Sequence, residues 1–311
     1  MQSFAIVVEI SLMKKNKLVY IGGPTCSGKT NLSILLANTL NTEIISCDSR
    51  QVYREISIGT AKPSKNKLIK IKHHFINHVS IHDDFNVGIF YNQANEILES
   101  LFKKINTVVM VGGSGLYADS IIHGIDHFPI VKTSVKKHVI SLFKNEGIKK
   151  LNLMLKEHDP EYYRIVDKNN PRRVIRALEV CLSSGKPFIS FFKKKIRNNF
   201  FETKILLMDS ERDVLYKKIN KRVDKMISLG LEKEAKNLFK YKHLNPLQTV
   251  GYNEFFNYFK GKYNYKCTIE EIKKNTRRYA KRQTTWNKRY KEAFLVKENY
   301  ELSEIINFIK K

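Results

Sequence analysis

The stretch Lys17-Leu-Val-Tyr-Ile-Gly-Gly-Pro-Thr-Cys-Ser-Gly-Lys-Thr30 decides the fold of this chain. Its first six residues are typical of a short buried strand, and a helical pattern follows over Lys29–Leu40. Between them, Gly23–Thr30 matches the G-x-x-x-x-G-K-[ST] pattern in full. In that setting the glycines turn backbone N–H groups inward, the lysine supplies a cation, and the threonine hydroxyl can ligate Mg²⁺. The stretch therefore predicts a loop that binds a di- or triphosphate, without saying which.

Further apolar runs alternate with helical patterns after this loop. Thr42–Cys47 and Thr107–Gly112 are β-branched runs that end at polar or glycine residues, and Val87–Lys104 between them has helical periodicity. Strands that alternate with helices predict a parallel sheet with crossover helices on its faces. We therefore expect an α/β fold with a phosphate-loop NTPase-like core.

The rest of the chain is predicted to be mostly helical. Residues 125–200 have helical or loop character, Lys204–Met208 is the only convincing late strand, and the chain is helical from Asp209 to its end. We expect three segments: the first part of the core in residues 13–124, a helical insertion in 125–200, and the second part of the core with basic C-terminal helices in 201–311.

The chain is strongly basic, and the excess charge is uneven. Its 311 residues include 56 Lys and Arg against 30 Asp and Glu, a net charge of +26. Only +3 of this lies up to Ile130 and +23 lies after it, which favours a large polyanionic partner such as nucleic acid. Compositional drift towards lysine is the alternative explanation. A hydrophobic content of 42% excludes wholesale disorder.

Composition also bears on the compartment. Four scattered cysteines without a CxxC pair fit a reduced, cytoplasmic setting. No run approaches the roughly 18 apolar residues that a membrane span needs. The opening residues lack the features of a signal peptide, and Met13 is an alternative start that would make residues 1–12 dispensable. We expect a monomer.

An acidic residue follows the second apolar run. Asp48 comes at the carboxyl end of a predicted strand, where ligands bind in open α/β sheets, so it should face the phosphate loop. A role as a turn or N-cap residue is the alternative. The neighbouring Ser49 and Gln51 could hydrogen-bond a base edge. The turn Gly112–Tyr117 follows another strand and is expected on the same face.

These motifs, in this order, resemble those of the tRNA dimethylallyltransferases, also called tRNA isopentenyltransferases. A phosphate loop alone is shared by many families, but the ordered series is specific and runs from about Lys17 to Trp286. Besides the loop, it comprises Asp48-Ser49-x-Gln51-x-Tyr53, Ile58–Pro63, His73–Ile76, Gly112–Tyr117, Arg176–Glu179, Arg222-Val223-Asp224-x-Met226, Gly251-Tyr252-x-Glu254 and Ala280-Lys281-Arg282-Gln283-x-Thr285-Trp286.

The resemblance implies a reaction. A dimethylallyl group would move from dimethylallyl diphosphate to N6 of the adenosine 3′ to a tRNA anticodon, with release of diphosphate. Asp48 would be the general base, with Thr25 and Arg222 as catalytic groups near the diphosphate. The resemblance also places His73 and His74 in a structural loop. The prenyl diphosphate, with Mg²⁺ on Thr30, would be held by Gly23, Pro24, Thr25, Cys26, Ser27, Gly28, Lys29 and Thr30.

Arg222 has a second interpretation when its helix is considered alone. It would then be a surface arginine on an amphipathic helix whose Val223, Met226 and Leu229 face inward. Only the resemblance moves it into the site.

Basic residues on two helices are expected to contact tRNA. The helix that begins at Pro171 puts Arg173 and Arg176 on one face, although a solvated face is the alternative. The helix Thr268–Lys291 is basic around an apolar stripe whose Trp286 we expect in the core. The residues predicted to meet tRNA are Asp48, Ser49, Arg50, Gln51, Ser114, Arg172, Arg173, Arg176, Lys281, Arg282 and Gln283.

Three other classes of protein remain as alternatives. An adenylate isopentenyltransferase prenylates a free nucleotide, but it would need neither the helical insertion nor the basic C-terminal helix. A phosphate-loop kinase or nucleic-acid-dependent ATPase normally carries an acidic residue at the end of an apolar strand. Thr107–Gly112 ends in glycine instead, although Asp48 could fill that role. A pure RNA-binding module would have no use for an intact phosphate loop.

Overall fold

A computed structural model describes residues 15–192 and 200–311 of the chain. The alternative start at Met13, the opening residues 1–12 and the basic tract 193–197 lie outside the described residues. The described residues form two compact units, one of residues 15–122 with 200–311 and one of residues 123–192. The predicted segment boundaries, after residues 124 and 200, lie close to these limits.

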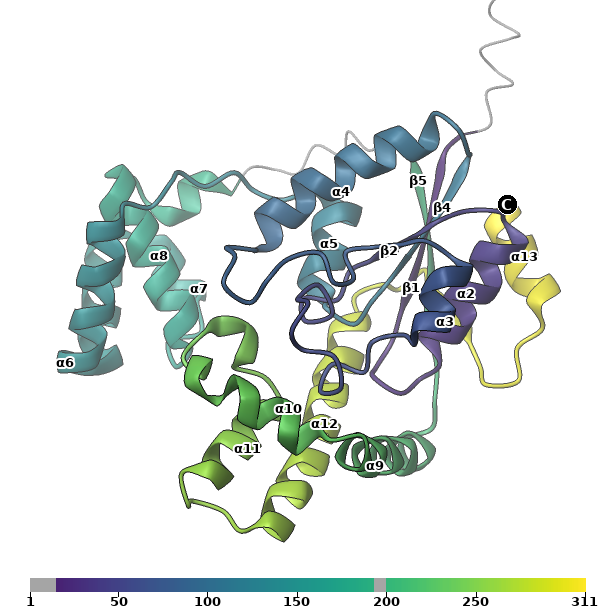
Figure 1. Ribbon diagram of the computed structural model, residues 1–311. Helices are drawn as coiled ribbons and strands as arrows, with labels where there is room; N and C mark the ends of the chain where they lie inside the picture. Colours follow the sequence, from purple (N-terminus) through teal and green to yellow (C-terminus); the bar gives the residue numbers. More distant parts are fainter. Residues whose placement is uncertain (1–14, 193–199) are drawn as a thin grey trace, which may run out of the picture. The chain divides into compact units, whose positions relative to one another are not determined.

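A six-stranded parallel sheet forms the centre of the first unit (Figure 1). The strand order is β3-β2-β4-β1-β5-β6, and each neighbouring pair runs parallel. The carboxyl ends of β1, β4 and β2 therefore lie side by side at one edge. The strands are β1 Lys17–Gly22, β2 Ile44–Ser46, β3 His73–His74, β4 Thr107–Val111, β5 Glu202–Met208 and β6 Phe294–Val296.

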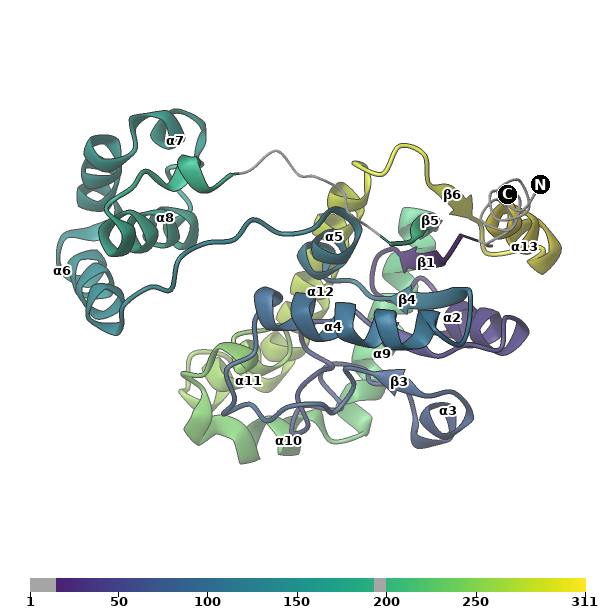
Figure 2. The same ribbon diagram turned by 90° about the horizontal axis from the view of Figure 1, so that it is seen from above.

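Helices cover both faces of this sheet, as the α/β prediction requires. Alternate residues of β1 belong to different hydrophobic clusters, because side chains of a strand point to opposite faces. Helices α2 and α13 pack on one face and α4 and α5 on the other (Figures 1 and 2). The helices of this unit are α2 Lys29–Thr39, α3 Lys65–Lys70, α4 Val87–Phe102, α5 Gly115–His123, α9 Arg212–Ser228, α10 Leu231–Leu238, α11 Tyr252–Phe259, α12 Tyr265–Asn287 and α13 Leu302–Lys310.

Two edge strands of the sheet lie where the sequence predicts loop or helix. The assignment of His73 and His74 to a loop is wrong, because they form β3 and pair with Ile44 and Ile45 of β2. The expectation of a wholly helical chain after Asp209 is also wrong, because β6 pairs with β5. Both strands have only two or three residues, too few to show an alternating pattern.

The second unit is helical where the structure describes it, as predicted. It contains α6 Thr133–His158, α7 Pro160–Ile165 and α8 Pro171–Ser184. Its own core includes Val139, Leu151 and Leu178, which are fully buried. Pro171 occupies the first turn of α8, and the Asn170 side chain accepts a backbone N–H as the N-cap.

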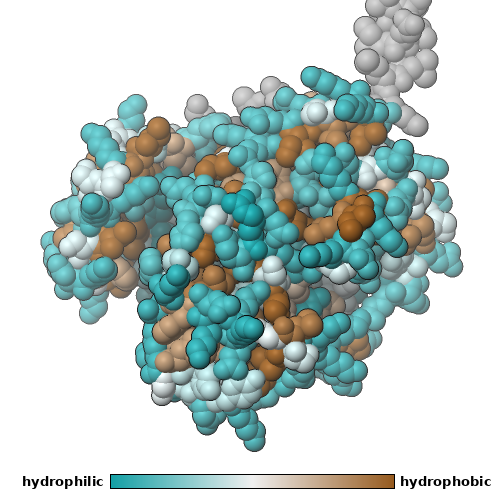
Figure 3. Space-filling model, viewed as in Figure 1, coloured by the Kyte–Doolittle hydropathy of each residue, from teal (hydrophilic) through white to brown (hydrophobic). Residues whose placement is uncertain are grey.

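Most of the surface shown in Figure 3 is hydrophilic, with smaller apolar patches. Leu229 is one exposed apolar residue, with 59% of its surface accessible. The prediction that Leu229 faces inward is therefore wrong, because α9 ends at Ser228 and the chain turns at Gly230. Val223 and Met226, by contrast, pack into the core as predicted. No helix of the described residues is both long and apolar enough to cross a membrane.

Candidate active site

The phosphate loop joins β1 to α2, as the sequence predicts. Gly23 and Gly28 have φ values of +140° and +94°, which glycine adopts at little steric cost. A side chain at Gly23 would also come within 2.9 Å of the Met208 Cβ. Because α2 begins at Lys29, its free N–H groups and positive end face the loop. The backbone is therefore shaped to receive an anion.

The Lys29 side chain bonds back to the phosphate loop to which it belongs. Its Nζ donates hydrogen bonds to the carbonyl oxygens of Gly23 at 2.9 Å and Pro24 at 2.6 Å. Burial of the ammonium group, and secondly the Arg222 guanidinium beside it, lower its pKa to about 8. An anion bound in the loop would counteract both causes, so anion binding and protonation of Lys29 should support each other.

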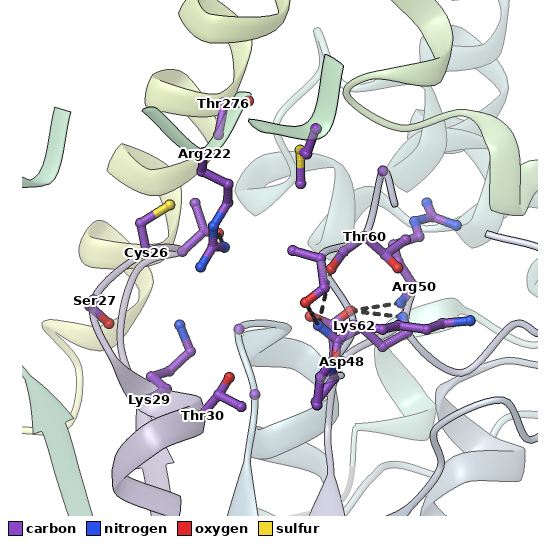
Figure 4. Close-up of a pocket in the computed structure, with 18 of the residues that line it drawn as sticks. Cys26, Ser27, Lys29, Thr30, Asp48, Arg50, Thr60, Lys62, Arg222 and Thr276 are labelled. Carbon is purple, nitrogen blue, oxygen red and sulfur yellow. Dashed lines mark hydrogen bonds between the residues drawn. The ribbon is translucent and has the colours of Figure 1, made fainter. Parts of the chain in front are cut away.

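Arg222 meets Thr25, although the two residues are far apart in sequence. The Arg222 side chain extends from α9, and its Nη1 donates a hydrogen bond to Thr25 Oγ1 at 3.0 Å. Figure 4 shows its guanidinium directed towards the phosphate loop. Two of the three predicted catalytic residues are thus in direct contact, and Arg222 is half-buried beside the loop. Their catalytic roles stay predictions.

Asp48 lies in the turn after β2 and lines the same cleft as the phosphate loop. Its Oδ1 accepts the backbone N–H groups of Arg50 at 2.9 Å and Gln51 at 3.2 Å, so the carboxylate is a turn residue. Within the described residues, its Oδ2 has no hydrogen-bond partner. One oxygen therefore fixes the side chain, while the other is available to a ligand in the cleft.

The phosphate loop, Arg222 and Asp48 all line one cleft of about 710 Å³. In Figure 4, Lys29, Thr30 and Arg222 lie on one side of it, and Asp48, Thr60 and Lys62 lie on the other. Apolar side chains contribute a further part of the lining. They are Val223, Met226, Leu231, Val250 and Ile272. The cleft can therefore hold a charged group at the loop and an apolar group beside it.

The turn after β4 supports the Asp48 wall. Ser114 Oγ accepts the backbone N–H of Ser49 at 2.9 Å and donates to Ser49 Oγ at 3.0 Å. Tyr279, from α12, lines the same cleft and is half-buried. Gly112 packs against Cys47, where an added Cβ would lie 2.5 Å from the Cys47 backbone. The two turns that the sequence placed on one face are thus in contact.

The segment Ser57–Lys62 completes this wall through contacts that sequence reasoning missed. The Glu234 carboxylate accepts the backbone N–H groups of Ser57, Ile58 and Gly59 at 2.9–3.1 Å, and also the Tyr252 hydroxyl. The Gln51 side chain donates to the carbonyl of Thr60 at 3.0 Å. In the sequence, the motif Ile58–Pro63 marks this segment, but nothing there indicates that Glu234 holds it.

Comparisons with known proteins agree on one family. The family model described as IPP transferase matches residues 51–290. The chain is 46% identical over 301 residues to a tRNA dimethylallyltransferase of Flavobacterium psychrophilum, covering 94% of this chain and 98% of that protein. It is 50% identical over 272 residues to one of Christiangramia forsetii, covering 87% and 90%. The chain belongs to the IPP transferase family.

Solved structures of family members share its fold. A tRNA isopentenylpyrophosphate transferase of Bacillus halodurans matches with a TM-score of 0.68 and 33% identity over 95% of both chains. A eukaryotic dimethylallyltransferase described as acting on tRNA matches with a TM-score of 0.76 and 27% identity, over 91% of this chain and 74% of that one. The predicted family and fold class are confirmed.

The residues predicted to contact tRNA fall into different environments in this family member. Lys281 and Arg282 are exposed on α12. Gln283 beside them is only 7% exposed, and its amide bonds to Thr25 and Gly113. Arg50 is half-buried, and its Nη1 bonds the Asn245 carbonyl at 3.1 Å. A tRNA role for each of these residues stays a prediction.

The basic face of α8 belongs to the second unit. Arg172 and Arg173 are exposed there, while Arg176 lies 5.6 Å from the Phe128 ring and 3.9 Å from Glu179. These arginines are available to a polyanion, and their role likewise stays a prediction. Trp286 is half-buried against Gly115, where an added Cβ would lie 2.2 Å from its ring. Trp286 belongs to none of the hydrophobic clusters of the described residues, so the prediction that it lies in the core is wrong.

Proposed function

We propose that this chain transfers a dimethylallyl group from dimethylallyl diphosphate to N6 of the adenosine that follows a tRNA anticodon. Membership of the family, and the names of its relatives as tRNA dimethylallyltransferases, support tRNA prenylation. One observation carries the finer proposal. A phosphate loop with Thr25 and Arg222, and a carboxylate with one unpaired oxygen, lie on two walls of the same cleft.

The phosphate-loop wall suits the leaving group. When the C1–O bond of the donor breaks, its electron pair and negative charge go to the diphosphate. In our proposal that charge develops beside the loop N–H groups, Lys29 and the Arg222–Thr25 pair, all of which lie at the cleft. Fixed donors are effective because they need no reorganisation during the reaction. The apolar lining beside them suits the prenyl chain.

The Asp48 wall suits the acceptor. The amine of adenine is a poor nucleophile, so N6 must lose a proton as it forms the new bond to C1. The unpaired Oδ2 of Asp48 accepts that proton in our proposal, while Oδ1 remains bonded to the turn. A positioned general base of this kind contributes about 10²–10⁴-fold to the rate.

Mg²⁺ fits the donor set at the loop. Within the described residues the Thr30 hydroxyl lines the cleft and has no hydrogen-bond partner. In phosphate loops such a hydroxyl ligates Mg²⁺ together with phosphate oxygens and water. We propose that Thr30 holds the ion, which would neutralise part of the charge on the diphosphate.

The acceptor must leave the stacked anticodon loop to reach Asp48. Extruding a base costs a few kcal/mol, which contacts between basic side chains and the tRNA backbone can offset. The exposed Lys281 and Arg282 of α12, and the arginines of α8, are the groups that we propose for this task.

The deciding experiment uses labelled dimethylallyl diphosphate with either unmodified tRNA or free AMP. We expect label in tRNA, located at N6 by nucleoside mass spectrometry, and none in AMP. Label in AMP but not in tRNA would assign the chain to nucleotide prenylation. Hydrolysis of ATP without any transfer of label would instead favour the ATPase alternative.

A further inference from the structure

A single buried amide connects the two walls of the cleft. Gln283, on the inner face of α12, accepts the backbone N–H of Thr25 through Oε1 at 2.8 Å. Its Nε2 donates to the backbone carbonyl of Gly113 at 2.9 Å. Thr25 belongs to the phosphate loop, and Gly113 belongs to the turn that supports the Asp48 wall. One side chain therefore sets the spacing between them.

The position of Gln283 requires a side chain that accepts one hydrogen bond and donates another. A backbone N–H can only donate and a carbonyl can only accept, so the amide has one possible orientation. A carboxylate would present an acceptor to the Gly113 carbonyl, and an aliphatic side chain would leave both backbone groups unsatisfied. Space is also limited, because a Cβ added at Gly113 would lie 2.1 Å from Gln283 Nε2.

Thr25 is held from two directions by two packed helices. Gln283 of α12 fixes its backbone, and Arg222 of α9 bonds its hydroxyl. The two helices pack through Leu215, Ile219 and Ala280, all of them buried. The position of the Thr25 hydroxyl, and of the guanidinium bonded to it, therefore depends on the Gln283 bond.

The same face of α12 reaches the cleft one turn earlier. Tyr279, four residues before Gln283, lines the same cleft as Asp48. Residues four apart lie on one face of a helix, so both side chains belong to the same stripe. The inner face of α12 thus contacts both walls, while exposed Lys281 and Arg282 lie outside it.

We propose that Gln283 is a positioning residue for the transfer reaction rather than a tRNA contact. It holds Thr25, and through Thr25 the Arg222 guanidinium, in register with the Asp48 turn. This inference rests on the proposed prenyl transfer, and it replaces the tRNA-binding role that the basic neighbours of Gln283 suggested.

The test compares variants at neighbouring positions of α12. Gln283→Met removes both hydrogen bonds at similar volume. We expect it to lower the single-turnover transfer rate at saturating substrates about 10²-fold, because small misplacements of reacting groups have effects of that size. Its Kd for tRNA should change less than about 2-fold. The matched variant Arg282→Ala should weaken tRNA binding, and Thr284→Ala, at an exposed site of the same helix, should change neither quantity.

A double-mutant cycle tests whether Gln283 acts through Thr25. In a Thr25→Val background the hydroxyl that Gln283 positions is already absent. Gln283→Met should then cost only a few-fold more, because the effects of coupled residues do not add. If the two losses simply multiply, Gln283 does not act through Thr25 and the proposal fails.

A second variant guards against misfolding. Gln283→Asn keeps a neutral amide that is one methylene too short to reach both Thr25 and Gly113, so we expect a smaller loss of rate with tRNA binding intact. If Gln283→Met does not fold, the transfer rate and the tRNA affinity of this second variant test the proposal. A wild-type chain that transfers no label to tRNA would sink the proposed function. If the wild-type chain does transfer label to tRNA, this inference alone fails in either of two cases. The Gln283 variants would keep the full transfer rate, or they would bind tRNA as weakly as Arg282→Ala.

Discussion

The two walls of the cleft are built in different ways. The phosphate-loop wall is almost continuous in sequence, since the consecutive residues Thr25–Thr30 line it together and Arg222 joins them from α9. The Asp48 wall is assembled from separate segments, including the turn at Ser114 and the segment Ser57–Lys62 held by Glu234. A local motif is therefore enough to find the first wall, whereas the second exists only through tertiary contacts.

The walls also differ in charge. Lys29 and Arg222 bring two cations together at the loop, close enough for Arg222 to contribute to the lowered pKa of Lys29. Opposite them, Asp48 presents a carboxylate with an unpaired oxygen, beside the ammonium group of Lys62 (Figure 4). The difference matches a reaction in which one wall receives a leaving anion and the other receives a proton.

The largest effect should follow from changing Asp48. Asp48→Asn keeps an acceptor for the turn but cannot accept the proton, so the transfer rate should fall about 10²–10⁴-fold. The dissociation constant for tRNA should stay close to that of the wild type. Single-turnover transfer and filter binding measure the two quantities. Substantial activity in Asp48→Asn would remove this residue as the general base.

A somewhat smaller effect is expected at Arg222 on the opposite wall. Arg222→Gln removes the charge and the bond to Thr25 Oγ1, so the rate should fall about 10²–10³-fold, as for other preorganised contacts to a developing charge. Arg222→Lys keeps the charge without the planar geometry and should recover part of the loss. Equal activity in all three proteins would show that the Arg222–Thr25 contact is only structural.

The pH dependence of donor binding tests the cation pair. Because the pKa of Lys29 is lowered to about 8, its ammonium group is lost in the free protein above that pH. A bound diphosphate favours the charged form, so affinity for an unreactive prenyl diphosphate analogue should fall up to about 10-fold per pH unit above pH 8.

The matched variant is Arg222→Gln, in which the second cause of the lowered pKa is absent. The break in its pH profile should therefore move to higher pH, whatever its absolute affinity. Calorimetry at several pH values gives both profiles. A wild-type affinity that stays constant from pH 7 to about pH 9.5 would contradict this account of Lys29.

The smallest effect concerns the basic outer face of α12. Affinity for an anticodon stem-loop should fall with salt, with a log–log slope of about −0.7 to −0.9 per phosphate contacted. Lys281→Ala or Arg282→Ala should each reduce the magnitude of that slope by about one contact. A slope near zero in the wild type would mean that the positive excess of the chain reflects composition alone.

Sequence patterns were sufficient where the chemistry is local. The phosphate loop follows from eight consecutive residues, and Asp48 from its place at the end of a strand. Glu234 could not be found in this way, because a glutamate on an amphipathic helix looks like a solvated residue and its partners are backbone N–H groups. The sequence predicts a tRNA contact for Gln283 among its basic neighbours, because its burial depends on how α12 packs.

The central claim is that donor and acceptor meet between these two walls, and a ternary complex tests it most directly. The measurement is the structure of the chain with an unreactive prenyl diphosphate analogue and an unmodified anticodon stem-loop. We predict the diphosphate in the Gly23–Thr30 loop and adenine N6 within about 3 Å of Asp48 Oδ2. An adenine whose N6 lies beyond hydrogen-bond reach of Asp48 while both ligands are bound would contradict the account.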